Sequence, residues 1–434
     1  MDANSISPLD GRYNYLLSYY NNNFSEVAFV RSRVIFEIDY FIFLLELNEE
    51  PFIFNESLKN LMIDIKNSVL FNFEPHFHEI KTIENQIKHD VKSIEYFLAN
   101  NLEKAGYKEY VNLLHFGLTS QDVNTFFYSN SINNWYHQVF SNLFQTSITD
   151  KLSEKIEKWK NIVIMGRTHG QPATWTTLGK EFSVYLYKLN YENKNLLNYN
   201  FTTKLGGAVG NLTSHNIFNS SYNWENLLQG FLVSNYDLNR TPKTTQIHNY
   251  NEYSVFFDSL KRVCSILVDM CSDIWLYCSL GELTLKKPSS HVGSSIMPHK
   301  VNPIEFENAE GNLKIAIMWL EFLSRELCVS RLQRDLTDST ILRNLGVVFS
   351  HIHIGFKMIE RGFLYLEANQ EKIEDILSNN LRSMSEVDQH ILRKDNNTNG
   401  YNSVKNKDTN DTSSKENVKI LKNKYKKYIL ESYV

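Results

Sequence analysis

The distribution of proline most constrains how this chain can fold. It has eight prolines, yet none lies between Pro75 and Pro172 and none follows Pro303. Because proline removes a helix hydrogen bond, stretches without it can form long helices. Both stretches carry apolar residues three and four positions apart, as amphipathic helices do. After Pro303 these residues are Ile304, Ala309, Leu313, Ile317, Leu320 and Leu323. Strand-like alternation is scarce. The sequence therefore predicts an all-α fold built around a bundle of long helices.

The length of the chain predicts more than one hydrophobic core. A chain of 434 residues suits two or three domains that each bury enough apolar surface to fold. We expect an N-terminal helical domain at residues 1–110, a central long-helix bundle at 111–363, and a reduced C-terminal helical domain at 364–434. In the last of these, about residues 395–417 are rich in Asn, Lys, Asp, Thr and Ser, which predicts a solvated insert. Residues 420–433 could then form a short basic helix.

Charge and hydropathy argue against two classes of partner. The 45 basic and 49 acidic residues give a formal net charge of -4, without the broad basic face that nucleic-acid binding requires. The first residues show no charged-then-apolar signal pattern, and no apolar run approaches the roughly 18 residues of a membrane span. We expect a cytoplasmic protein that binds neither nucleic acid nor a membrane.

The cysteines favour core packing over metal binding. Cys264, Cys271 and Cys278 recur every seven residues, which places them on one face of a helix, and Cys328 stands alone. A structural metal site would need closely spaced Cys/His pairs such as C-x-x-C, and the sequence has none. We expect no metal site.

One short loop, Gly293 to Pro303, combines features that packing alone would not select. Two adjacent hydroxyls follow the glycine, a Met-Pro pair comes next, and Lys300 and Asn302 stand just before a proline that suits a helix start. Polar donors therefore gather on one loop. The simpler interpretation is a surface loop with helix-capping serines, which is the default for an isolated Ser-Ser pair. The length of the pattern favours a functional loop.

Together with two further segments, this loop resembles the signature blocks of the fumarase/aspartase superfamily. All fixed positions of Gly-Ser-Ser-x-Met-Pro-x-Lys-x-Asn-Pro are present in residues 293–303. Residues 115–122 read HFGLTSQD and residues 167–174 read RTHGQPAT, in the order in which the superfamily uses such blocks. The resemblance implies a three-domain, all-α fold whose central bundles assemble into a tetrameric helical core.

Within the superfamily the chain is most similar to the adenylosuccinate lyases. The similarity rests on residues 7–13 (SPLDGRY), 89–92 (HDVK) and 334–343 (RDLTDSTILR), and it covers roughly residues 5–374. It implies elimination of fumarate from adenylosuccinate to give AMP. It also implies the same reaction on succinyl-aminoimidazole-carboxamide ribotide (SAICAR), which gives AICAR. Both belong to purine nucleotide biosynthesis and need no cofactor.

The family match assigns the catalytic roles. Ser294 is the expected general base and His169 the general acid that protonates the leaving nitrogen. A serine can act as a base only if its alkoxide is stabilised, here by backbone N–H groups of the loop and by Lys300. Glu307 matches the carboxylate that orients the acid histidine and favours its charged form. Without the match, an exposed helix carboxylate would be the simpler interpretation of Glu307.

The match also assigns the groups that bind the substrate. Guanidinium groups suit the phosphate because they present a planar fork of donors. The expected phosphate ligands are Arg12, Arg334 and Arg343. The rest of the nucleotide site is expected to comprise Tyr13, His89, Asp90, Ser339 and Thr340. The succinyl carboxylates are expected to contact Lys300, Asn302, Thr119 and Ser120, while Gln246 places the substrate. Further candidates for substrate binding are Thr168, Ser295 and Asn308.

The resemblance implies a homotetramer whose active sites are shared between subunits. Each site is expected to take residues from three chains, with His169 and Ser294 supplied by different ones. The run at residues 206–211 (GGAVGN) superficially suggests a dinucleotide loop, but no strand-then-helix pattern surrounds it. We interpret it as a loop of the bundle.

The match weakens at two places, and two other functions are conceivable. Close relatives would read Gln-Ile-Glu-Pro-His-Asp where residues 246–251 read QIHNYN, and Lys88 replaces an asparagine of some members. One alternative is a lyase that releases fumarate from argininosuccinate, which would leave the three arginines without a phosphate. The other is a helical protein without catalysis, which would have no need of His169, Ser294, Lys300 and Glu307 together.

Overall fold

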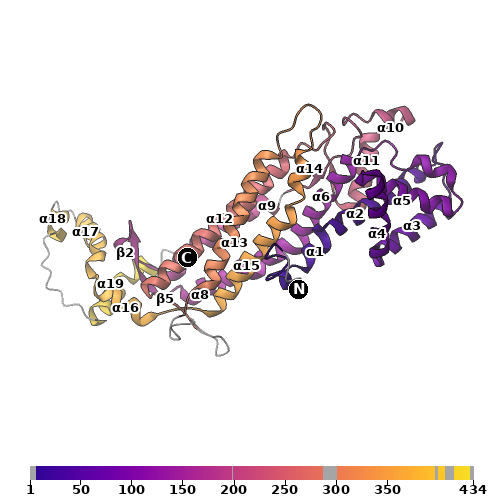
Figure 1. The fold of residues 1–434 in the computed structure, drawn as a ribbon. Helices are drawn as coiled ribbons and strands as arrows, with labels where there is room; N and C mark the ends of the chain where they lie inside the picture. Colours follow the sequence, from indigo (N-terminus) through magenta and orange to yellow (C-terminus); the bar gives the residue numbers. More distant parts are fainter. Residues whose placement is uncertain (1–5, 198, 287–300, 396–398, 406–414, 431–434) are drawn as a thin grey trace. The chain divides into compact units, whose positions relative to one another are not determined.

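A computed structural model describes residues 6–197, 199–286, 301–395, 399–405 and 415–430. The chain divides into two compact units, each built from three separate stretches (Figure 1). The first unit comprises Met1–Ser141, Leu196–Lys261 and Met318–His351. The second comprises Asn142–Asn195, Arg262–Ile317 and Ile352–Val434. Segments far apart in the sequence therefore share each core.

In its described residues, the first unit is helical apart from one short pair of strands and an isolated bridge between Glu49 and Phe52. Its helices are α1 (Ser18–Phe24), α2 (Glu26–Glu46), α3 (Glu56–Phe71), α4 (Phe73–Ile87), α5 (Asp90–Lys104), α6 (Ser120–Trp135), α10 (Thr213–Phe218), α11 (Trp224–Tyr236) and α14 (Thr337–Leu342). Short 3-10 segments lie at Asn14–Leu16 and Lys108–Leu113, and a short π segment lies at Tyr136–Phe140. The strands β3 (Thr202–Thr203) and β4 (Asn239–Arg240) pair in parallel, with Thr202 opposite Asn239.

The described part of the second unit consists of helices and two antiparallel pairs of strands. Its helical segments are Phe144–Thr149, α8 (Asp150–Trp159), α16 (Gln370–Ser378), Leu381–Met384, α17 (Ser385–Lys394), α18 (Gly400–Lys405) and α19 (Lys415–Leu430). The strands β1 (Val163–Thr168) and β2 (Gln171–Thr177) form a hairpin with a bulge between Met165 and Arg167. The strands β5 (Leu283–Leu285) and β6 (Leu366–Ala368) form the other pair.

Several helices contribute residues to both units. They are the short α7 (Ser141–Leu143) and the long α9 (Leu178–Leu197), α12 (Asn251–Leu280), α13 (Ile304–Glu326) and α15 (Leu345–Tyr365). As predicted, α13 begins directly after Pro303, and Cys264 and Cys271 are buried along α12, whereas Cys278 is partly buried and Cys328 is exposed. In the second unit α13 and α15 approach so closely that a side chain at Gly355 would collide with Leu313.

Helix α2 is central to the core of the first unit. Its N-terminus is capped by Ser25, whose hydroxyl accepts a hydrogen bond from the Ala28 amide at 3.2 Å. Its inner face carries aromatic rings, and the ring of Phe36 stacks on Phe126 of α6 with centroids 4.4 Å apart. Burying a side chain of this size stabilises a fold by about 1.5–3 kcal/mol. The packing of α2 against α6 holds these two helices together, and both carry residues of the candidate site.

The all-α fold class is confirmed, since the described strands are short and lie between helices. The predicted C-terminal helix is also present, as α19. The predicted insert at about 395–417 contains one helix, α18, while 396–398 and 406–414 lie outside the described residues. The bounds of the three predicted domains stay a prediction.

Among the described residues, α12 alone has the length and composition that would also suit a membrane span. Its most apolar window of 18 residues has a mean hydropathy of 1.5, and 33% of that window is buried. Core helices of soluble proteins have the same properties, so this finding does not identify a membrane protein. The expectation of no membrane partner stays a prediction.

Candidate functional site

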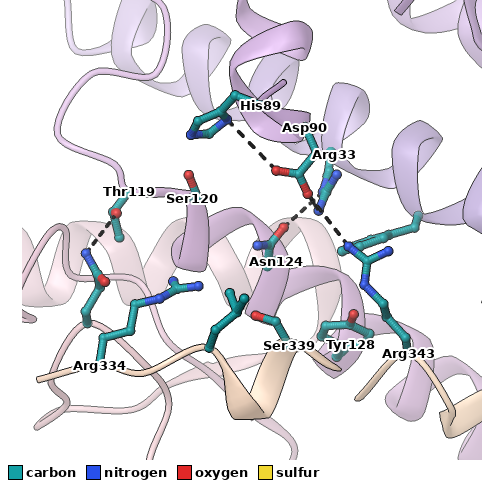
Figure 2. A pocket seen from close by; sticks show the side chains of 13 residues that line it. Arg33, His89, Asp90, Thr119, Ser120, Asn124, Tyr128, Arg334, Ser339 and Arg343 are labelled. Carbon is teal, nitrogen blue, oxygen red and sulfur yellow. Dashed lines mark hydrogen bonds and ion pairs between the residues drawn. The ribbon is translucent and has the colours of Figure 1, made fainter. Parts of the chain in front are cut away.

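A cavity of about 330 Å³ in the first unit gathers many of the predicted substrate-binding residues (Figure 2). They come from α5, α6, α14, the residues that flank these helices, and the connection between β4 and α12, which carries Gln246. The predicted residues that line the cavity are His89, Asp90, Thr119, Ser120, Gln246, Arg334, Ser339 and Arg343. They are separated by up to 254 positions in the sequence, from His89 to Arg343, so folding alone brings them together.

The N-terminal ends of two helices border this cavity. His89 caps α5, and its Nδ1 accepts a hydrogen bond from the Lys92 amide at 3.0 Å. Thr119 caps α6, where the Asp122 side chain accepts from the Thr119 amide at 2.7 Å. A helix N-terminus carries partial positive charge, which favours anions in its neighbourhood.

The cap also determines which nitrogen of His89 can meet a ligand. Because Nδ1 accepts a hydrogen bond from a backbone amide, it holds no proton, and the proton of the neutral ring lies on Nε2. His89 is therefore arranged as a hydrogen-bond donor through Nε2.

Three guanidinium groups and one carboxylate give the cavity its charge. Arg33 donates to Asp90 with 2.7 Å between Nη2 and Oδ2, and Nη2 of Arg343 lies 3.9 Å from the same oxygen. Arg334 also lines the cavity. Burial raises the pKa of Asp90, but the charge and hydrogen bond of Arg33 outweigh it and hold that pKa below its usual value. The cationic excess suits a doubly charged phosphate.

Behind the Thr119 turn lies a fully buried ion pair. Lys204 Nζ is 2.6 Å from Asp122 Oδ1, and neither side chain is exposed. Asp122 also accepts from the backbone amide of Gly206 at 2.8 Å, and Lys204 donates to the carbonyl of Gly207 at 2.7 Å. Asp122 thus ties the Thr119 turn to the glycine run at 206–210. This run is a loop of the fold, as the sequence predicted.

Asp338 holds the segment that carries Ser339. Its Oδ2 accepts from Gln121 Nε2 at 2.8 Å and from the Tyr250 hydroxyl at 3.1 Å, while Oδ1 accepts from the Ser339 amide at 2.8 Å. Burial raises the pKa of Asp338. Because α14 has only six residues, these contacts, rather than its own helix, fix the place of Ser339.

The connection that leads into α6 is anchored to α2. His115 Nδ1 lies 2.5 Å from Glu37 Oε1, and the Tyr40 hydroxyl donates to the Phe116 carbonyl at 3.1 Å. His115 has a φ of 57°, in the left-handed region that costs energy for a non-glycine residue. The side-chain contacts hold this strained backbone in place, four residues before Thr119.

The segment at 246–251, where the family pattern departs, is also buried in this unit. His248 Nε2 lies 2.7 Å from the Thr241 hydroxyl and 3.0 Å from that of Thr202, while Nδ1 accepts from the Tyr250 amide. Burial lowers the pKa of His248 to about 3, so the ring is neutral. Gln246 Nε2 lies 3.4 Å from the Thr119 hydroxyl. The unusual histidine is therefore a buried, hydrogen-bonded part of the fold, and Gln246 contacts the Thr119 turn.

Other predicted residues lie elsewhere. In the first unit, outside the cavity lining, are Arg12, Tyr13 and Thr340. In the second unit are Thr168, His169, Asn302, Glu307 and Asn308. Outside the described residues are Ser294, Ser295 and Lys300.

Within the described part of one chain, His169 and Glu307 make no hydrogen bond or ion pair with each other. His169 is exposed in the turn between β1 and β2, with a left-handed φ of 54°. Glu307 is exposed in the first turn of α13, where its Oε1 accepts from Trp275 Nε1 at 3.0 Å. Their predicted roles stay predictions.

The sequence prediction missed part of the cavity lining. The missed residues are Phe29, Arg33, Asn124, Tyr128 and Leu336. The sequence could have indicated Arg33, because it stands among apolar residues on the inner face of α2, where an unpaired charge would be costly. Phe29 and Tyr128 gave no such indication, since aromatic residues at helical spacing usually pack in a core.

Comparison with known proteins identifies the family. The profile of a family described as Lyase matches residues 44–316, and one described as Adenylosuccinate lyase C-terminal matches 330–428. The chain is 40% identical over 405 residues to the adenylosuccinate lyase of Dictyostelium discoideum, which covers 92% of this chain and 87% of that relative. The chain belongs to the adenylosuccinate lyase family. A second adenylosuccinate lyase, from Legionella pneumophila strain Corby, is 36% identical over 93% of this chain and 88% of its own.

Solved structures share the fold of this adenylosuccinate lyase family member. A fumarate lyase from Mesorhizobium sp. BNC1 superposes with a TM-score of 0.72 at 16% identity, over 89% of this chain and 84% of that one. A 3-carboxy-cis,cis-muconate lactonizing enzyme from Pseudomonas putida gives 0.68, also at 16% identity, over 90% and 85%. At these identities the likeness concerns the fold alone.

Proposed function

We propose that this protein eliminates fumarate from adenylosuccinate to give AMP, and from SAICAR to give AICAR, in purine nucleotide biosynthesis. The observation that carries the proposal is the cavity, which gathers Arg334, Arg343 and Ser339 with Thr119 and Ser120. Its guanidinium groups suit a phosphate, and hydroxyls at a helix N-terminus suit a carboxylate. A substrate with both groups would use the whole lining.

The proposed reaction is a β-elimination. Ser294, as an alkoxide, takes a proton from the succinyl carbon next to the carbon that bears nitrogen. The released electron pair forms the double bond of fumarate, the C–N bond breaks, and the nitrogen takes a proton from His169. Lys300 stabilises the alkoxide, and Glu307 favours the charged form of His169. Asn302, Asn308, Thr168 and Ser295 are proposed to contact the succinyl end, with Arg12, Tyr13 and Thr340 at the nucleotide end.

The arrangement of His89 supports giving the acid role to His169. A general acid must lose and regain a proton during each turnover. Nδ1 of His89 is engaged in capping α5 and is therefore not available to exchange a proton with the substrate. We propose that His89 donates a hydrogen bond from Nε2 to the substrate and that His169 supplies the proton.

We propose a cytoplasmic homotetramer with active sites shared between subunits. Three long helices expose apolar side chains within the second unit, where they would otherwise face water. These include Tyr187 and Tyr191 on α9, Leu276 on α12, and Ile304 and Ile315 on α13, with exposed fractions of 75%, 62%, 51%, 57% and 40%. A contiguous helical subunit interface would bury such residues.

The direct test of the substrate is the change in ultraviolet absorbance when purified protein meets adenylosuccinate or argininosuccinate. We expect turnover of adenylosuccinate and SAICAR and none of argininosuccinate, because only the nucleotides bring a phosphate for Arg334 and Arg343. A flat trace with adenylosuccinate, from folded protein, contradicts the proposed function. Turnover of argininosuccinate alone favours the other lyase.

Shared sites are tested by mixing two inactive variants. His169→Ala and Ser294→Ala are each expected to be inactive as pure oligomers. After they are unfolded and refolded together, sites that take the intact histidine from one chain and the intact serine from another should regain part of the wild-type activity. Absence of recovery in oligomers verified to contain both chains contradicts the sharing.

A further inference from the structure

Arg33 borders the cavity, although its side chain is only 1% exposed. Every contact of its guanidinium fixes it to the protein. Nε donates to Asn124 Oδ1 at 2.9 Å, Nη2 donates to Asp90 Oδ2 at 2.7 Å, and Cζ lies 3.6 Å from the centroid of the Phe29 ring. A guanidinium held by two hydrogen bonds and a ring has little freedom to move.

A second guanidinium approaches the same carboxylate oxygen. Nη2 of Arg343 lies 3.9 Å from Asp90 Oδ2, which is within ion-pair range but beyond a hydrogen bond. Figure 2 shows Arg33 and Arg343 reaching Asp90 from two directions. Arg343 is half exposed. Its other contacts are a long 3.4 Å from Nη1 to Glu26 Oε2 and 5.5 Å from Cζ to the centroid of the Phe29 ring. Arg33 therefore holds Asp90, while Arg343 is only loosely engaged.

The two arginines compete for one negative charge. A partly buried carboxylate needs a cation or hydrogen-bond donors, because burial otherwise penalises its charge. Asp90 obtains them from Arg33 and from the Val91 amide, which donates to Oδ1 at 2.9 Å. Without Arg33, the permanently charged group nearest to Asp90 is Arg343, which would need to move by about 1 Å to form a hydrogen bond. His89 Nδ1 also lies 3.9 Å from the carboxylate, but it already accepts from the Lys92 amide.

We propose that Arg33 is a positioning residue that neutralises Asp90 and so leaves the Arg343 guanidinium available to bind a phosphate. The inference rests on the proposed function, because it takes the ligand to be a nucleoside monophosphate. Arg33 itself contacts protein groups and acts through Asp90. Loss of Arg33 draws Arg343 onto Asp90 and weakens phosphate binding without removing any phosphate ligand.

The test compares binding of AMP and adenosine, which differ only in the phosphate, measured by titration calorimetry. For Arg33→Met we expect the affinity for AMP to fall about tenfold or more, as for one lost charge-assisted contact, and that for adenosine to change less than twofold. KM for adenylosuccinate should rise by a similar factor, with kcat within about twofold. An unchanged ratio of AMP to adenosine affinity overturns the proposal.

A double-variant cycle separates positioning from direct binding. In an Asp90→Asn background no carboxylate remains to capture Arg343, so Arg33→Met should then change the affinity for AMP by less than about twofold. The same tenfold loss in both backgrounds means that Arg33 binds the phosphate itself and overturns the positioning role. Arg33→Lys retains the charge beside Asp90 and should preserve most of the AMP preference, which also provides a readout if Arg33→Met does not fold.

Arg240 provides the matched control. It is also a buried arginine of the first unit, 6% exposed, whose Nε donates to the Leu205 carbonyl at 2.6 Å, and it does not line the cavity. Arg240→Met should lower stability but keep the ratio of AMP to adenosine affinity. An equal fall of that ratio in both variants makes the effect of Arg33 merely structural and overturns the proposal. Wild-type protein that does not prefer AMP contradicts the proposed function itself.

Discussion

Glu37 Oε1 lies 2.5 Å from His115 Nδ1, in a pair whose side chains are 1% and 14% exposed. Burial disfavours the charged ring, but the Glu37 carboxylate outweighs it and raises the pKa of His115 to about 8. The folded state therefore holds the proton more tightly than the unfolded state, where the pKa is near 6.5. This contribution to stability is complete below pH 6.5 and is lost as pH rises through about 8.

We predict that the free energy of unfolding falls by about 2 kcal/mol between pH 6.5 and pH 9 through this pair. Urea unfolding at several pH values measures it. Glu37→Gln removes the carboxylate, so its stability should be lower at pH 6.5 and should vary less over the same range. Parallel pH profiles for the wild type and Glu37→Gln contradict the assignment.

Two buried histidines predict that the free energy of unfolding also falls as the pH is lowered from 6.5. Burial lowers the pKa of His248 to about 3 and that of His215 to about 4. Both rings stabilise the folded state above pH 6.5, and each contribution is lost as pH falls, by about 1.4 kcal/mol per pH unit. His248→Gln should flatten the profile between pH 6.5 and pH 5 by about that slope. An unchanged slope means that His248 is not buried as a neutral ring.

The Lys204–Asp122 pair predicts a large loss of stability from a small change. Asp122→Asn leaves a buried lysine without its counter-charge, which typically costs about 3–5 kcal/mol. It should also raise KM, because Asp122 accepts from the Thr119 amide. Chemical denaturation and steady-state kinetics measure the two effects. As a comparison, Asp122→Asn combined with Lys204→Met removes both charges and should recover part of the stability.

Tyr250 and Tyr253 offer a matched pair of Tyr→Phe variants, because each hydroxyl donates one hydrogen bond in the core of the first unit. Tyr250→Phe removes a hydrogen bond to Asp338, which in turn holds Ser339, so we expect a loss of about 1 kcal/mol and a several-fold rise in KM. Tyr253→Phe removes a comparable bond to the Thr202 carbonyl, at 2.6 Å, that does not reach the cavity. It should lower stability without changing KM. An equal rise in KM for both variants contradicts the specific role of Asp338.

The sequence predicted the helices better than it predicted the residues that hold the cavity side chains in place. Proline spacing and apolar periodicity were sufficient for α13, because a long helix is specified by its own residues. The motif around Thr119 and the arginines after Arg334 could be assigned from their types and order. The partner of Asp90 could not, because nothing in the sequence near Asp90 indicates that Arg33, on another helix 57 positions earlier, donates to it.

The same limit applies to Tyr250 and Asp338, whose contact spans 88 positions. Such pairs arise from the packing of α2 with α5 and of α14 with the segment before α12, which no local pattern encodes. Arg33 at an inward position of α2 was the one visible sign, since a buried charge requires a partner. The sequence showed that a partner is needed and left its identity to the fold.

The central claim is that the cavity holds the phosphate end of a succinyl-nucleotide. Its most direct measurement is the ratio of kcat/KM for adenylosuccinate to kcat/KM for succinyladenosine, the same molecule without the phosphate. Two charge-assisted contacts, from Arg334 and Arg343, are worth about 3–6 kcal/mol, so we predict a ratio of about 10² to 10⁴. A ratio near one, with wild-type protein that turns over both compounds, would contradict the account.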